Sequence, residues 1–142
     1  MQGSEGRLTP TGVALRAFIV GLVVVTGYIH STLGGLLFSL NALGYAVAAI
    51  AMILPLGLAI RYRGVVRLGL IGYAATTIVG WALMGPRYPT AYLAKADELL
   101  LIAVLAVDFL RADGSPVAYA RSVASDALGF VGRRPAAAGS QA

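Results

Sequence analysis

The sequence predicts an all-α fold, an integral membrane four-helix bundle followed by a possible interfacial amphipathic helix. Residues 17–60 contain no Asp, Glu, Lys or Arg. This run is long enough for two bilayer crossings of about 20 residues each. Of all 142 residues, 58% are hydrophobic and 12% are charged, whereas soluble domains carry about 25% charged residues. Both observations exclude an ordinary soluble domain and indicate a membrane protein.

Four apolar segments make up the expected membrane domain, residues 13–110, after a polar N-terminal tail at 1–12. A compact turn separates the first two segments, and a basic turn separates the second from the third. Gly and Pro interrupt helices, so the Gly- and Pro-containing stretch before the fourth segment is expected to be a loop. The spans are expected at about 13–29, 36–60, 65–84 and 91–110.

The remaining segment, 111–142, is expected to be a cytoplasmic tail. Apolar residues recur at helical spacing between 117 and 131, which is typical of a weakly amphipathic helix lying on a membrane surface. A disordered tail is the equal alternative for this stretch. Residues 133–142 are of low complexity, which favours disorder.

Basic residues predict the orientation, because cytoplasmic loops carry an excess of Lys and Arg. With the N-terminus inside, only Arg87 and Lys95 lie outside, and both termini are cytoplasmic. The abundance of Arg, Ala, Gly and Val suggests a bacterial source, hence the bacterial inner membrane. The net charge of +5 then reflects topology and anionic lipids, not nucleic acid. The expected inner arginines are Arg7, Arg16, Arg61, Arg63, Arg67, Arg111, Arg121, Arg133 and Arg134.

Small residues recur at helical spacing on two spans and predict close helix packing, because lipid gives helices no hydrophobic reason to associate. Whether the partner helix belongs to the same chain or to another subunit stays open. The alternative is that Ala and Gly are simply frequent in this chain. The predicted packing face comprises Gly35, Ser39, Ala42, Ala46 and Ala49 on the second span, and Gly69, Gly72, Thr76 and Gly80 on the third.

Polar residues near the outer end of the bundle form a candidate pocket. Lys95 and Glu98 are three apart on one helix flank and can pair, whereas Asp97 needs a partner on another element. The alternative is that the charges are solvated at head-group level. Near the inner end, Asp108 is expected to pair with Arg111. The predicted pocket comprises His30, Asn41, Trp81, Arg87, Lys95, Asp97 and Glu98, and Arg87, His30 or Asn41 is the expected partner of Asp97.

Catalytic and cofactor motifs are scarce. The chain has no cysteine, which excludes thiolate chemistry, and it has a single histidine. No P-loop, nucleophile elbow or dinucleotide fingerprint is present. We therefore expect no enzyme activity. The sequence requires no metal or cofactor, although His30 is a conceivable axial ligand for a pigment or haem.

Three segments, 27–35 (GYIHSTLGG), 40–45 (LNALGY) and 80–87 (GWALMGPR), resemble parts of small bacterial four-span proteins known only as uncharacterised membrane proteins. The resemblance implies four spans and brings no activity. The chain also has the size of small multidrug transporters and fluoride channels. It lacks the glutamate that the former carry in their first span, and it has no motif of the latter.

The expected function is that of a non-enzymatic structural or accessory subunit of a larger bacterial membrane complex. A respiratory or photosynthetic complex is a natural host, although no residue selects one. Packing faces and the lack of a catalytic set favour the subunit role. The expected partners are the lipid bilayer and either other membrane subunits or further copies of the chain. The alternative is a small homo-oligomeric transporter or channel that uses Asp97 for a proton or cation.

Overall fold

The computed structural model describes residues 9–54 and 62–132, and within these ranges the chain is helical with no strand. The predicted all-α class is confirmed. A helix also occupies the stretch predicted at 117–131. The helices are α1 (Pro10–Thr32), α2 (Leu36–Ile53), α4 (Arg63–Met84), α5 (Pro89–Ala112) and α6 (Pro116–Gly132).

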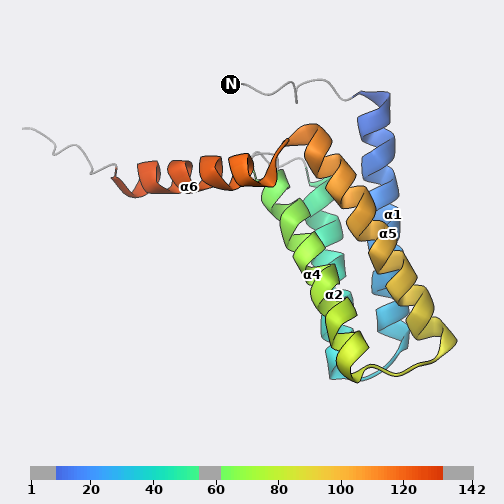
Figure 1. The fold of residues 1–142 in the computed structure, drawn as a ribbon. Helices are drawn as coiled ribbons and strands as arrows, with labels where there is room; N and C mark the ends of the chain where they lie inside the picture. The colour runs from blue at the N-terminus through green and yellow to red at the C-terminus, as the bar shows by residue number, and fades with distance from the viewer. Residues whose placement is uncertain (1–8, 55–61, 133–142) are drawn as a thin grey trace, which may run out of the picture.

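Four of these helices stand side by side and alternate in direction, while α6 leaves the bundle crosswise (Figure 1). α1 packs against α2 and α5, and α4 packs against α5. The seam between α2 and α4 is the lightest of these contacts. The α1–α2 and α4–α5 loops lie at one end of the bundle, and α6 starts at the other (Figure 1).

Local chemistry sets the ends of α1. The Thr9 hydroxyl accepts a hydrogen bond from the Gly12 N–H at 3.2 Å, and Pro10 occupies the first turn, where its missing N–H costs nothing. The chain then reverses through Gly34 and Gly35, whose φ angles are +70° and +89°. Residues that carry a side chain rarely adopt these backbone angles, so the two glycines make the tight turn into α2 possible.

Membrane character is clearest in α1, α2 and α4, which are long and apolar enough to cross a bilayer. α5 is equally long, but it carries three charged residues, Lys95, Asp97 and Glu98, within about one turn. Among the described helices it is therefore not counted as apolar enough to cross a bilayer. α2 ends at Ile53, and positions 55–60 of the predicted second span lie outside the described residues.

The apolar core lies between α1, α2 and α5, around Ile19, Val23, Tyr45, Leu101 and Leu105. Large apolar side chains also cover the outside of the bundle. Exposed apolar patches of this extent are characteristic of surfaces that meet lipid or another protein. Examples on the four bundle helices are Val24, Leu43, Val79 and Leu99, each more than half exposed.

Buried charge joins α4 to the end of α5. The Arg67 guanidinium, 1% exposed, donates from Nε to Asp108 Oδ2 at 2.6 Å and from a terminal nitrogen to Asp113 Oδ2 at 2.8 Å. The predicted pairing of Asp108 with Arg111 is therefore wrong. Asp108 is buried beside α4, which supplies its cation, whereas Arg111 is exposed.

Tyr119 fastens the first turns of α6 to the bundle. Its hydroxyl accepts a hydrogen bond from the Val65 N–H at 3.1 Å, and its ring meets Phe109 edge-on at 5.4 Å. Gly64 permits this contact, because an added Cβ would collide with the Tyr119 ring. Beyond this contact Leu128 is largely exposed, so α6 presents side chains that the bundle does not cover.

Candidate functional site

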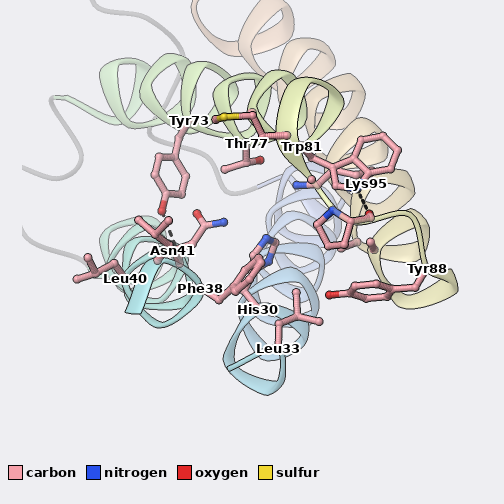
Figure 2. A pocket seen from close by; sticks show the side chains of 17 residues that line it. His30, Leu33, Phe38, Leu40, Asn41, Tyr73, Thr77, Trp81, Tyr88 and Lys95 are labelled. Atoms are coloured by element: carbon pink, nitrogen blue, oxygen red, sulfur yellow. Dashed lines mark hydrogen bonds between the residues drawn. The ribbon is translucent and has the colours of Figure 1, made fainter. Parts of the chain in front are cut away.

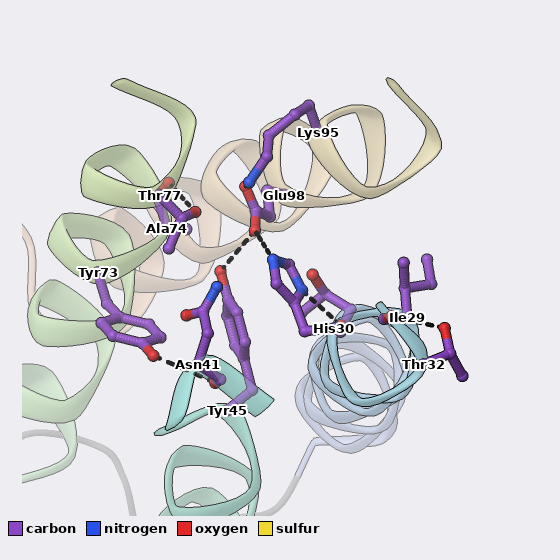
Figure 3. Close-up of polar contacts among 11 residues, drawn as sticks. Ile29, His30, Thr32, Asn41, Tyr45, Tyr73, Ala74, Thr77, Lys95 and Glu98 are labelled. Carbon is purple, nitrogen blue, oxygen red and sulfur yellow. Dashed lines mark hydrogen bonds and ion pairs between the residues drawn. The ribbon is translucent and has the colours of Figure 1, made fainter. Parts of the chain in front are cut away.

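The most highly connected polar group inside the bundle is the Glu98 carboxylate, whose side chain is 0% exposed. Its Oε2 accepts a hydrogen bond from Lys95 Nζ at 2.6 Å, and its Oε1 accepts one from the Tyr45 hydroxyl at 3.0 Å. His30 Nε2 lies 3.5 Å from the same Oε1. Three helices, α1, α2 and α5, thus converge on one carboxylate (Figure 3).

Hydrogen-bond chemistry assigns a hydrogen to one ring nitrogen of His30. Its Nδ1 lies 2.8 Å from the Thr26 backbone oxygen, and because a carbonyl can only accept, Nδ1 must carry hydrogen. Nε2 faces the Glu98 carboxylate, so both ring nitrogens of His30 have a polar neighbour.

A pocket of about 500 Å³ lies between this cluster and the loop that joins α4 to α5. His30 from α1, Asn41 from α2 and Lys95 from α5 contribute polar groups to its wall (Figure 2). Most of the remaining lining is apolar or aromatic, including Leu37, Leu40, Phe38, Trp81 and Met84. A mostly apolar pocket with a few convergent polar groups is the usual form of a small-molecule site.

Of the predicted pocket residues, four line this cavity: His30, Asn41, Trp81 and Lys95. Glu98 is not part of the lining but binds both His30 and Lys95. The predicted Lys95–Glu98 pairing is present.

Arg87 and Asp97 lie outside the pocket lining. The Arg87 guanidinium stacks 4.2 Å from the Trp81 ring centre and donates to the Ala82 carbonyl at 2.7 Å. It is therefore not the partner expected for Asp97, and His30 is turned to Glu98 instead. Asp97 Oδ2 is buried and, among the described residues, has no hydrogen-bond partner.

Tyr45 and Tyr73 are site residues that sequence reasoning missed. Tyr45 is fully buried, and the Tyr73 ring packs edge-on against it at 5.0 Å. The Tyr73 hydroxyl donates to the Asn41 backbone oxygen at 3.1 Å (Figure 3). A signal existed for Tyr45, because it follows Asn41 by four residues and so shares its helix face.

The predicted packing face divides between covered and open positions. Ala49 is buried and Ala42 is partly buried, and the Ala42 carbonyl approaches Gly27 of α1. Gly80 lines the pocket. An added Cβ at Gly69 or Gly72 would meet no atom within 4 Å. The exposed members are Gly35, Ser39, Ala46, Gly69, Gly72 and Thr76.

Axial ligation of a pigment or haem does not fit His30. One ring nitrogen is held by the Thr26 carbonyl and the other faces Glu98, so neither has a free lone pair aimed at a metal. Within the described ranges, no three His, Asp or Glu side chains are grouped as a metal site. Comparisons of the chain with protein families, curated proteins and solved structures find no match.

Proposed function

We propose that the protein spans the bacterial inner membrane four times, with α5 as the fourth crossing. At about 1.5 Å per residue, the 24 residues of α5 extend about 36 Å, enough to cross the apolar layer. Three of its five charged residues, Lys95, Glu98 and Asp108, are buried and paired. Intramembrane charges normally face the bundle interior in this way. The outer surface of α5 carries Leu93, Leu99, Leu100, Val107 and Leu110.

Both ends of the described chain lie on the α6 side of the bundle (Figure 1), and we assign that side to the cytoplasm. Arg16, Arg63, Arg67 and Arg111 lie in the parts of α1, α4 and α5 nearest this side, and Arg121 belongs to α6. Among the described residues, Arg87 and Lys95 are the Arg and Lys side chains that belong to the other side. The positive-inside rule favours this orientation, and it would lay the exposed surface of α6 along the inner membrane face.

The topology can be tested with single cysteines, because the natural chain has none. Thr90→Cys, at the exposed start of α5, is expected to react with an impermeant thiol reagent in intact cells. Ser125→Cys, on exposed α6, is expected to react only after the membrane is opened. Labelling of both positions in intact cells would contradict four crossings with both termini inside.

Within this topology the proposed function is non-enzymatic: a structural or accessory subunit that associates with other membrane proteins. The observation that carries it is the open flank of α4. Gly69 and Gly72 have no neighbour at the Cβ position, and Thr76 beside them is exposed. Small residues exposed to lipid let another helix approach closely.

Gly72→Leu is expected to reduce association, because a branched side chain holds a partner helix away from the α4 backbone. Gly21→Leu on α1 is the matched control, since that glycine is also exposed and also has open space at Cβ. Gentle solubilisation followed by native mass measurement should show a loss of roughly tenfold in partner-bound protein for the first variant only. A monomeric wild type, or equal assembly of both variants, would refute the role assigned to this flank.

A small homo-oligomeric transporter or channel for a proton or cation is the second candidate. It is favoured by Asp97, whose buried Oδ2 has no hydrogen-bond partner in the described part of the chain. Such a carboxylate oxygen is available to a cation. The neighbouring Glu98 is less suited, because Lys95 and Tyr45 occupy its two oxygens.

Asp97→Asn separates the two candidates, because it removes the charge and keeps the size. If Asp97 carries a proton or cation, flux into proteoliposomes should fall by roughly a hundredfold while the protein stays folded, since losing the charged site removes a few kcal/mol of ion binding. Wild-type protein without any pH- or cation-dependent flux would eliminate this candidate.

A further inference from the structure

We propose that the pocket at the outer end of the bundle binds a single-chain amphiphile with an anionic head group, of the class of long-chain fatty acids. The pocket joins a cationic wall to an apolar volume that opens toward lipid. The inference goes beyond an accessory role, and it does not depend on any partner subunit.

The apolar rim of the pocket indicates where such a ligand enters. Leu37 on α2 is 81% exposed and Met84 on α4 is 87% exposed, and both line the cavity. Between them lies the lightly packed α2–α4 seam. A hydrocarbon chain can therefore pass from the bilayer into the pocket without crossing a polar barrier. The volume of about 500 Å³ lies within the usual range of ligand pockets, about 300–1,000 Å³.

The charge of the wall selects the head group. Lys95 and His30 line the pocket, whereas Glu98 lies behind them and outside the lining. The Lys95 ammonium carries three hydrogens, and one of them is donated to Glu98 Oε2, so charged donors remain for a ligand in the pocket. Asp97, the nearest other carboxylate in the sequence, does not line the pocket. A carboxylate placed beside Lys95 can therefore accept charge-assisted hydrogen bonds from the ammonium.

A cationic ligand would find no comparable site in this pocket. Glu98 is fully buried, and its oxygens accept hydrogen bonds from Lys95 and Tyr45. A further polar group of the lining is the Asn41 amide, whose Oδ1 is buried and has no partner among the described residues. Because an amide can turn over, it can present its NH₂ donors to a carboxylate.

Binding is tested with three labelled C16 probes of equal chain length: the carboxylate, the alcohol and the amine. The full chain in nanodiscs made of zwitterionic lipid is expected to bind the carboxylate saturably, and roughly tenfold more tightly than the alcohol or amine. Equal binding of the three probes would mean ordinary partition into the nanodisc, and it would overturn the proposal.

Two variants locate the site. Gly80→Phe places a ring in the pocket, where an added Cβ meets no atom within 4 Å, and it should abolish saturable binding. Gly21→Phe, at an exposed and equally open position on α1, should bind as wild type does. Undiminished binding by Gly80→Phe would place the amphiphile elsewhere and refute the assignment.

The charge argument has its own variant. The double substitution Lys95→Gln with Glu98→Gln removes both members of the ion pair, so no buried charge is left without its partner and the fold is spared. It should bind the carboxylate and the alcohol equally, because the Lys95 ammonium has gone from the pocket wall. A retained preference for the carboxylate in this variant would show that the cluster does not select the head group.

Discussion

Glu98→Ala is expected to destabilise the protein by about 3 kcal/mol, because it strands Lys95 inside the bundle without its counter-charge. Lys95 is 8% exposed and His30 is 3% exposed, so neither group has free access to water. Tyr45 loses its hydrogen-bond acceptor as well. The free energy of unfolding, measured by denaturant titration in mixed micelles, should show the loss.

Asp97→Asn is the matched control for this experiment. It changes the adjacent carboxylate on the same helix, which among the described residues makes no hydrogen bond through Oδ2. Its effect on the free energy of unfolding should stay within about 0.5 kcal/mol. If the two variants were equally stable, Glu98 would not be the centre of the cluster.

Arg67→Met should likewise cost about 3 kcal/mol, since Asp108 would then remain buried without a cation. Asp108 is 6% exposed, and Arg67 Nε is its partner at 2.6 Å. The pair joins α4 to the end of α5, so we expect loss of the packed bundle. Protease resistance and thermal unfolding in detergent would report it.

A double-mutant cycle isolates this ion pair. Adding Asp108→Leu to Arg67→Met should recover much of the lost stability, because an apolar pair replaces an unpaired charge. Arg111→Met is the control, since Arg111 is exposed and should change stability by less than about 0.5 kcal/mol. A large effect at Arg111 would restore the pairing of Asp108 with that residue.

Hydropathy and turn chemistry, which are local properties of the chain, determined the helical class and most helix positions. The paired glycines at 34–35 and the Gly–Pro sequence at 85–86 mark loops wherever they occur. The predicted first, third and fourth spans accordingly match α1, α4 and α5 to within a few residues. For 117–131 local signals left a helix and a disordered tail as equal alternatives, and the structure has the helix α6 there.

Tertiary structure alone decided which charged groups meet. Asp97 and Glu98 are adjacent in sequence and chemically alike, and the sequence favoured Asp97 as the functional carboxylate. The rotation of α5 against α1 and α2 turns Glu98 inward to His30 and Tyr45. A helix advances about 100° per residue, so Asp97, one residue before the buried Glu98, points toward a different side of α5. No single-chain pattern reports that rotation, because neighbouring helices set it through packing.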